Sequence, residues 1–341
     1  MTDLPLLGLM LGDPTGIGPE QCARVLADRR LSDCARLVVI GDARVLAQGA
    51  RDAGVNLDSR ECATPEDADW SSDDVPLIDL RNHDPAKFPR AAISADSGRI
   101  AGETLKYMID LALEARIDGI TFGPLNKAAL NAGGWRFNDE HQMFANLTRH
   151  QGFFGEMNVL DNLWMSRVTS HVSLRTALDQ ITGERIDAAL TLADATMRAA
   201  GFAQPRIAVC ALNPHGGESG LFGREEIEVI APAVAKAAQR GIGCQGPFPS
   251  DTVFLKAFAG DFDGVLSMYH DQGQIATKLK GFNRGVTVTA GLETVFTTPS
   301  HGTAFDIVGR GTATTGALEQ AIRLCSRLAA SRRSFTANRE P

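Results

Sequence analysis

Three of the chain's seven histidines lie in polar segments that follow short apolar runs. His171 lies in TSHVSLRTA, His215 in LNPHGGE and His270 in MYHDQGQ. Neutral imidazoles from separate strands can bind one divalent metal and leave coordination positions open for a substrate. The long intervals between these residues match no local metal motif, so separate hydrogen-bonded loop histidines are the alternative. Asp271, next to His270, either orients that ring or caps a turn.

Two further residues are candidates for proton transfer. Lys127 in PLNKAAL and Asp251 in PSDTVF both lie on loops after predicted strands. A buried lysine close to a metal can titrate near neutrality and act as an acid or a base. Each residue also has a simpler interpretation, Lys127 as a solvated helix residue and Asp251 as the N-cap of the helix TVFLKAFA.

Three glycine-rich segments are candidates for cofactor loops. GIGCQG, residues 241–246, has the G-x-G-x-x-G pattern, but it follows a helical pattern, whereas a dinucleotide fingerprint follows a strand and begins a helix. We therefore exclude it. GDPTGIGPE, residues 12–20, has neither the spacing of that fingerprint nor a phosphate-binding lysine, and is either a tight turn or a ligand loop. The small residues of segment 299–317 let a ligand approach the backbone, with His301 and Asp306 as polar groups.

The elements that must position these residues alternate along the chain. Apolar runs such as LLGLML, RLVVIG and RIAVCALNP precede longer helical patterns. Runs this continuous in aliphatic residues are typical of strands covered on both faces, so we expect an α/β fold with largely parallel sheet. Ligands of such sheets lie beyond the carboxyl ends of the strands. Residues 58–97 are expected to form a surface excursion and residues 331–341 a frayed tail.

The composition argues against several classes of partner. The chain has 341 residues and a net charge of −7 without a basic run, which argues against nucleic acid. No apolar run approaches the roughly 18 residues of a membrane span. Residues 4–11 are predicted to be a buried strand rather than a signal peptide. Six dispersed cysteines without a C-x-x-C pair indicate reduced thiols, so we expect a cytoplasmic protein that binds a small molecule.

Several long segments together resemble the 4-hydroxythreonine-4-phosphate dehydrogenase family. They are GDPTGIGPE, GPLNKAAL, HVSLRTAL, LNPHGGESGLFGREE, GPFPSDTVF, YHDQGQIATKLKGFNRGV and HGTAFDIVGRGTA. The resemblance implies a fold similar to the isocitrate and isopropylmalate dehydrogenases, with two α/β/α domains. It also implies an active site in the interdomain cleft, at the interface of a homodimer. We expect a nucleotide-binding domain of residues 1–128 and 285–341, and a metal-binding, substrate-binding and dimerisation domain of residues 129–284.

The same resemblance implies the residues of the site. A divalent metal would bind His171, His215 and His270, and three imidazoles favour zinc over magnesium, manganese or cobalt. Lys278 would contact the substrate, and NAD would bind the HGTAFDI segment. The NAD-binding residues implied in this way are His301, Gly302, Thr303, Ala304 and Asp306.

The chain departs from the family's phosphate-binding pattern at four positions. Where the phosphosubstrate enzymes carry Gly-His-Thr-Glu, this chain has NDEHQMF, which places Glu140 and His141 at substrate-binding positions. Thr287 and Phe296 replace an asparagine and an arginine. Loss of the arginine removes a bidentate phosphate clamp, and a carboxylate at Glu140 would repel a dianion. Phe296 would instead offer an apolar face suited to a ring. This pattern, above all GPLNKAALNAGGW followed by NDEHQMF, resembles the terephthalate dihydrodiol dehydrogenase branch of the family.

These departures lead us to expect NAD-dependent oxidative decarboxylation of a cis-dihydrodiol of an aromatic carboxylate. The reaction would convert 1,2-dihydroxy-3,5-cyclohexadiene-1,4-dicarboxylate to 3,4-dihydroxybenzoate, carbon dioxide and NADH. The metal would lower the pKa of the alcohol, and Asp251 and Lys127 would move protons. One alternative is a dehydrogenase of 4-hydroxythreonine 4-phosphate, or of threonate or erythronate 4-phosphate. The other is a catalytically silent protein that binds metal or nucleotide.

Overall fold

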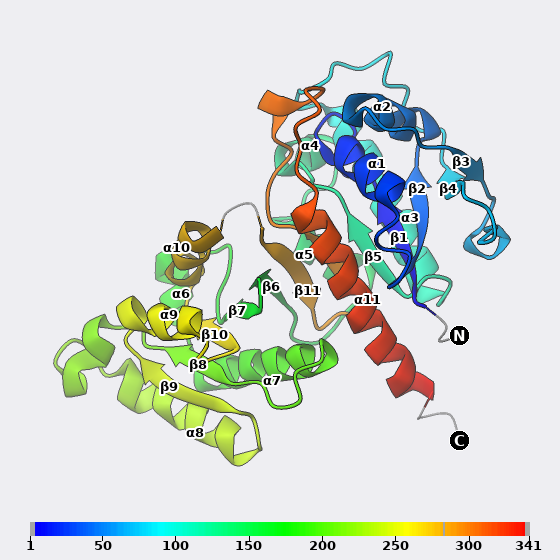
Figure 1. Ribbon diagram of the computed structural model, residues 1–341. Coiled ribbons are helices and arrows are strands. Elements are labelled where there is room, and N and C mark those ends of the chain that lie inside the picture. Colours follow the sequence, from blue (N-terminus) through cyan, green and yellow to red (C-terminus); the bar gives the residue numbers. More distant parts are fainter. Residues whose placement is uncertain (1–3, 282–283, 338–341) are drawn as a thin grey trace. The chain divides into compact units, whose positions relative to one another are not determined.

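The computed structural model describes residues 4–281 and 284–337 of the chain (Figure 1). The chain forms two compact units, one of Met1–His150 with Leu292–Pro341 and the other of Gln151–Gly291. These divisions differ from the expected ones, because residues 129–150 belong to the first unit and residues 285–291 to the second. The roles expected for the two domains stay predictions.

The first unit contains a parallel sheet with the strand order β3-β4-β2-β1-β5-β12. Its strands are β1 (Leu6–Met10), β2 (Arg36–Gly41), β3 (Ser59–Glu61), β4 (Val75–Asp79), β5 (Gly119–Phe122) and β12 (Val295–Pro299). The central strands β1 and β5 are almost wholly buried and consist mainly of apolar residues, as expected for a parallel sheet covered on both faces. The predicted α/β fold is confirmed for this unit.

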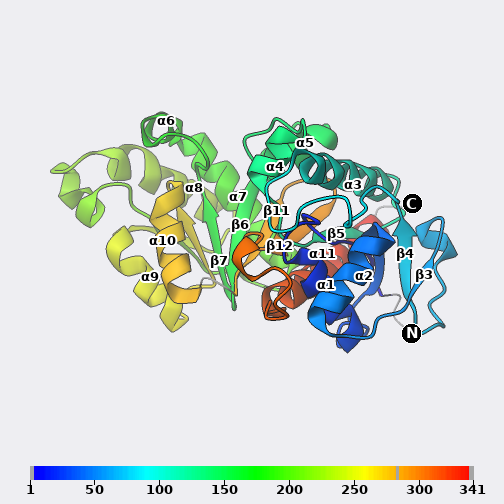
Figure 2. The same cartoon turned by 90° about the horizontal axis from the view of Figure 1, so that it is seen from above.

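Helices cover both faces of the first unit's sheet. They are α1 (Gly18–Asp28), α2 (Ala43–Ala53), α3 (Ala95–Leu113), α4 (Lys127–Ala132), α5 (Glu140–Leu147) and α11 (Gly316–Ala337), with the short η1 (Pro65–Asp67) and η4 (Phe305–Ile307). Figure 2 shows α3, α4 and α5 together on one side of the sheet and α1 and α2 on the other. The N-cap side chains of α2 to α5 each accept a hydrogen bond from a first-turn backbone N–H, which fixes where these helices begin.

The second unit contains a mixed sheet with the strand order β11-β6-β7-β10-β8-β9. Its strands are β6 (Gly155–Leu160), β7 (Leu163–Arg167), β8 (Ile207–Cys210), β9 (Cys244–Phe248), β10 (Gly264–Ser267) and β11 (Val286–Ala290). β6 pairs antiparallel with both β11 and β7. The pairs β7–β10, β10–β8 and β8–β9 are parallel, so the carboxyl ends of β7, β10, β8 and β9 lie along one edge of the sheet.

The helices of the second unit connect these parallel strands. They are α6 (Leu174–Gln180), α7 (Gly183–Ala199), α8 (Ala231–Gln239), α9 (Ser250–Ala259) and α10 (His270–Gly281), with the irregular η2 (Pro214–Gly220) and the π-helical η3 (Glu226–Ile230). The GIGCQG segment joins the end of α8 to β9, so the helix-to-strand order that excluded it as a dinucleotide loop is confirmed.

Two expectations about irregular segments are wrong. The segment 58–97 contains β4, which lies between β3 and β2 and buries Leu77 and Ile78, so this part is sheet rather than surface excursion. α11 continues to Ala337 through most of the expected frayed tail, and residues 338–341 lie outside the described residues.

None of the helices in the described part of the chain combines the length and the apolar character that a membrane crossing requires.

Candidate functional site

The three histidines singled out from the sequence follow three neighbouring parallel strands of the second unit. His171 comes after β7, His270 begins α10 shortly after β10, and His215 comes after β8. Because β10 pairs with both β7 and β8 in parallel, these residues reach the same edge of the sheet. The carboxyl ends of parallel strands are where α/β proteins bind ligands.

The rings of His171 and His270 lie close together. Their centroids are 5.3 Å apart, with the ring planes tilted by 44°. Both rings line a pocket of about 190 Å³. Its other residues include Thr169, Ser170, Tyr269 and Asp271. In this pocket His270 Nδ1 lies 2.7 Å from Asp271 Oδ1, so the ring can donate Nδ1–H to the carboxylate and present Nε2 to a ligand. This contact has the geometry that the orienting role expected for Asp271 requires.

His215 lies apart from this pair. Its ring centroid is 6.4 Å from that of Phe222, and it does not line the pocket of His171 and His270. Among residues 4–281 and 284–337, no group of three or more His, Cys, Asp or Glu side chains is placed to hold a metal. The structure thus brings two of the expected ligands together, and places the third on a loop at the same edge of the sheet.

Backbone conformation marks two of the three histidines. His171 has φ of 51° and His215 has φ of 54°, in the left-handed region that residues with a Cβ seldom adopt. Such conformations persist only where the surroundings enforce them, and they concentrate at functional sites. Imidazole nitrogens, one of them on a ring held by a carboxylate, are donors of the type that a divalent cation binds, but only His171 and His270 lie together here.

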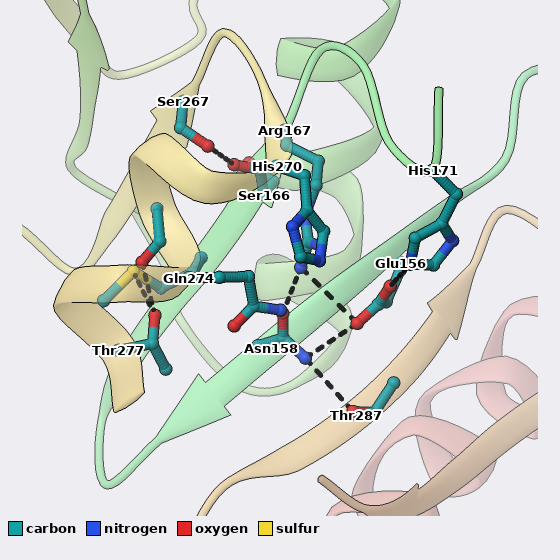
Figure 3. Close-up of polar contacts among 12 residues, drawn as sticks. Glu156, Asn158, Ser166, Arg167, His171, Ser267, His270, Gln274, Thr277 and Thr287 are labelled. Atoms are coloured by element: carbon teal, nitrogen blue, oxygen red, sulfur yellow. Dashed lines mark hydrogen bonds and ion pairs between the residues drawn. The ribbon is translucent and has the colours of Figure 1, made fainter. Parts of the chain in front are cut away.

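A buried polar cluster adjoins the two histidines, and sequence reasoning missed it (Figure 3). Glu156 Oε1 accepts a hydrogen bond from Asn158 Nδ2 at 3.0 Å and lies 3.4 Å from an Arg167 guanidinium nitrogen. Its other oxygen, Oε2, lies 3.9 Å from His171 Nε2. Arg167 also donates to Asn158 Oδ1, and Asn158 Nδ2 donates to Thr287 Oγ1 at 3.1 Å. The cluster therefore links one expected metal ligand to one expected substrate residue.

In the first unit, the expected NAD-binding segment packs against the start of α1. Thr303 is buried and its carbonyl oxygen accepts from the Ile17 N–H at 3.1 Å, whereas Gly302 and Asp306 are exposed. Ala304 has φ of 43°. The exposed backbone at Gly302, where an added Cβ would meet no atom, leaves room for a ligand close to the main chain.

Lys127 and Glu140 form an ion pair in the first unit. Lys127 Nζ lies 3.3 Å from Glu140 Oε2, where α4 and α5 begin. The Lys127 side chain is exposed and that of Glu140 is mostly buried. His141 is buried and meets Phe144 edge-on at 6.5 Å between ring centroids. Of the two proposed substrate residues of this segment, the structure thus places Glu140 beside the lysine and buries His141 against Phe144, and Lys127 is the accessible side chain.

Phe296 is a core residue, which corrects its expected role. Its side chain is 1% exposed and stacks on Phe144 at 4.2 Å between ring centroids, with an interplanar angle of 7°. A ring held in this way cannot also cover a substrate ring. The apolar residue at this position stabilises the first unit's core.

The two remaining candidates lie on helices of the second unit. Asp251 is exposed in the first turn of α9, which begins at Ser250 after Pro249 without a side-chain cap. Its interpretation as an N-cap is therefore wrong, because the helix begins at Ser250, two residues before the expected start at Thr252. Lys278 is exposed in the last turn of α10.

Comparison with known proteins gives consistent results. The family described as pyridoxal phosphate biosynthetic protein PdxA matches residues 33–325. A Pseudomonas aeruginosa protein with the provisional name 4-hydroxythreonine-4-phosphate dehydrogenase 2 is 48% identical over 329 residues, 95% of this chain and 97% of that protein. The D-threonate 4-phosphate dehydrogenase of Cupriavidus necator is 40% identical over 330 residues, 96% of this chain and 98% of that protein. The solved structure of 4-hydroxythreonine-4-phosphate dehydrogenase from Klebsiella pneumoniae is 37% identical, covers 96% of this chain and 98% of its own, and has a TM-score of 0.83.

The expected terephthalate dihydrodiol branch is wrong. The solved structure of terephthalate 1,2-cis-dihydrodiol dehydrogenase from Burkholderia xenovorans LB400 is only 26% identical, over 95% of this chain and 98% of its own, with a TM-score of 0.66. Relatives with much higher identity are named for phosphorylated substrates. The expectation relied on Phe296 as a surface for an aromatic ring, and that side chain is in the core.

Proposed function

The chain belongs to the family of pyridoxal phosphate biosynthetic protein PdxA, and from this premise we propose that it is a dehydrogenase of a four-carbon hydroxy acid 4-phosphate. D-threonate 4-phosphate and 4-hydroxythreonine 4-phosphate are the substrates that the names of its relatives suggest. NAD would accept the hydride, and a divalent metal would assist. The structural observation that carries the proposal is the pair of imidazoles, His171 and His270, at the ends of neighbouring parallel strands.

The chemistry follows from the substrate. With the carboxylate carbon as C1, oxidation of the hydroxyl on C3 removes a hydride from that carbon and a proton from its oxygen. The product is a ketone β to the carboxylate. Such a β-keto acid loses carbon dioxide, and the electron pair of the broken bond passes to the ketone oxygen. We include this decarboxylation in the proposal. The enzyme must therefore bind two anionic groups, remove one proton and stabilise an oxygen that gains negative charge.

His171, His215 and His270 would hold the metal. A divalent cation held there would lower the pKa of the substrate hydroxyl and stabilise negative charge on the carbonyl oxygen. Asp271 holds His270 with Nε2 directed away from the carboxylate. Glu156 places a negative charge 3.9 Å from His171 Nε2, which favours a cation in the pocket. Zinc suits imidazole ligands, and magnesium, manganese and cobalt are the alternatives to compare.

Cationic side chains would bind the anionic groups of the substrate. Lys278 is exposed on α10 and would contact the phosphate or the carboxylate. Lys127 is exposed and paired with Glu140, an arrangement that can pass a proton between an amine and a carboxylate. Asp251, exposed at the start of α9, is the other acid–base candidate. Because Phe296 is in the core, phosphate recognition relies on these lysines rather than on an arginine at that position.

We also propose a homodimer. Three large apolar side chains on α9 and α10 are strongly exposed: Leu255 (70%), Ile275 (61%) and Leu279 (84%). Ile275 and Leu279 lie one turn apart on α10, and neighbouring exposed apolar side chains mark an interaction surface. Lys278 is next to Leu279 in the sequence. Substituting Leu279→Asp should shift the protein from dimer to monomer in sedimentation velocity, and an unchanged dimer would exclude this surface.

A substrate panel tests the proposed activity. Purified protein with NAD and one divalent metal at a time is given D-threonate 4-phosphate, 4-hydroxythreonine 4-phosphate or erythronate 4-phosphate, and NADH is followed by absorbance. We expect turnover of at least one phosphorylated acid, release of carbon dioxide, and loss of both after treatment with a chelator. His270→Ala should abolish turnover. Absence of NADH with every substrate and every metal would leave the silent binding protein as the better description.

A further inference from the structure

The first turn of α1 holds the loop that connects β12 with α11. Gln21 is 0% exposed, and its Nε2 donates to the Thr314 carbonyl oxygen at 2.7 Å and lies 3.1 Å from His301 Nε2. Glu20 is 2% exposed, and its Oε1 accepts from the Ala313 backbone N–H at 2.9 Å. Two adjacent buried side chains of one helix thus bind both ends of the loop.

These contacts select one tautomer of the His301 ring. The Thr314 carbonyl oxygen can only accept, so the group of Gln21 that faces it is the amide nitrogen. The same nitrogen faces His301 Nε2, which must therefore accept. The ring proton then lies on Nδ1, which donates to the Gly302 carbonyl oxygen at 3.0 Å. Gln21 thereby fixes the orientation and the tautomer of the His301 ring.

The GDPTGIGPE segment meets the middle of the same loop. The Ile17 N–H donates to the Thr303 carbonyl oxygen at 3.1 Å. A Cβ added at Gly16 would lie 2.9 Å from the Thr303 Cβ, closer than real Cβ contacts allow. The glycine at this position is therefore explained by close contact with the protein's own loop rather than with a ligand.

We propose that Gln21 is a positioning residue for NAD binding, and that residues Gly16–Gln21 form a clamp that holds the His301–Asp306 loop in its binding shape. This inference rests on the proposed function, because NAD is the ligand expected at that loop. A loop fixed before binding loses little conformational entropy when the ligand arrives, which strengthens binding. Gln21 acts through His301 and the loop backbone, and need not touch the cofactor.

The test is the dissociation constant of NADH, measured by fluorescence titration without substrate. Gln21→Met keeps the size of the side chain and removes its hydrogen bonds to His301 and Thr314. We expect the Kd for NADH to rise about tenfold, because two part-buried hydrogen bonds that hold the loop are lost. The matched control is Thr121→Val, which removes a buried hydrogen bond of 2.9 Å to Thr297 in the same unit. The control should lower the Tm and leave the Kd unchanged.

A second variant changes a different contact of the same loop, the one between Gly16 and Thr303. Gly16→Ala pushes on Thr303 without changing Gln21, and it should weaken NADH binding in the same direction. If Gln21→Met fails to fold, Gly16→Ala decides the question. If the wild type binds NADH and the folded variants bind it equally well, the clamp is wrong and the proposed function stands. If the wild type binds no NADH, both the clamp and the proposed dehydrogenase are wrong.

Discussion

His270 Nδ1 lies 2.7 Å from Oδ1 of Asp271, its neighbour in sequence. A carboxylate on one ring nitrogen fixes the orientation and the tautomer of an imidazole and makes the other nitrogen a better ligand. The dipeptide His-Asp after an apolar run thus favours one tautomer of the imidazole, with the proton on Nδ1 and Nε2 available to a ligand.

Removal of this carboxylate should weaken metal binding. We expect Asp271→Ala to raise the dissociation constant for zinc by roughly 10- to 100-fold, as loss of such partners does elsewhere. Competition with a chromogenic zinc chelator measures it directly. Asp261→Asn, an exposed aspartate of the same unit, is the control and should bind zinc like the wild type. Equal affinity in Asp271→Ala would show that the contact has no role in ligation.

Loss of Arg167 should strongly destabilise the second unit. Its side chain is 4% exposed and lies beside the Glu156 carboxylate, which is 10% exposed. Arg167→Met would leave that carboxylate without its cation, at a cost of roughly 3–5 kcal/mol in the free energy of unfolding. Urea unfolding measures this. In the double variant with Glu156→Gln, part of the loss should return, and additive effects would mean that the two residues do not interact.

Gly98 should be intolerant of any side chain. A Cβ there would lie 1.8 Å from the Ala129 carbonyl oxygen, where α3 packs against α4. Since α4 carries Lys127 at its start, Gly98→Ala should lower both stability and turnover, with a stability loss of about 1–3 kcal/mol typical of overpacking. Gly316→Ala, where an added Cβ meets no atom, is the control for thermal unfolding. A normal Tm for Gly98→Ala would contradict the close approach of the two helices.

Acid should destabilise the first unit through His83. Burial lowers the pKa of this imidazole, which is 3% exposed and stacked on Phe88 at 4.5 Å between ring centroids. As the pH falls below roughly 6.5, the unfolded chain binds a proton before the folded chain does. Stability is therefore full above that pH and decreases as the pH falls towards the folded-state pKa. His83→Phe keeps the stack and should lose less stability than the wild type between about pH 7.5 and pH 5.5. Parallel stability curves would exclude His83 as the cause.

Much of the fold and part of the site follow from the sequence alone. Apolar runs such as LLGLM have the composition of strands buried on both faces, and these runs are strands of largely parallel sheets. The histidines at the ends of such runs share one sheet edge because β7, β10 and β8 are neighbours. Strand order depends on contacts between distant segments, so the position of His215 relative to the other two could not be deduced from spacing.

The polar cluster around Glu156 and the burial of Phe296 had weak sequence signals or none. Glu156 and Asn158 are two residues apart on β6, so their side chains point to the same face of the sheet. This two-residue spacing of polar residues in a strand could have predicted that they interact. The buried state of Phe296 had no local signal, because a phenylalanine in an apolar strand reads the same whether it faces the core or a ligand. That ambiguity produced the incorrect aromatic substrate.

The loop that carries His215 takes its shape from one side chain. Glu226 Oε1 accepts from the backbone N–H groups of Leu212 and Asn213 at 2.8 and 2.7 Å, and Oε2 accepts from Asn213 Nδ2 at 2.9 Å. Residues 215–219 are left-handed throughout and lack the repeating hydrogen bonds of a strand or an α-helix. Substituting Glu226 would remove the contacts that hold the start of the His215 loop, and would leave the pairing of β7 with β10, which positions His171 and His270, untouched. Evolution could therefore alter the His215 loop independently of the strands that carry the other two histidines.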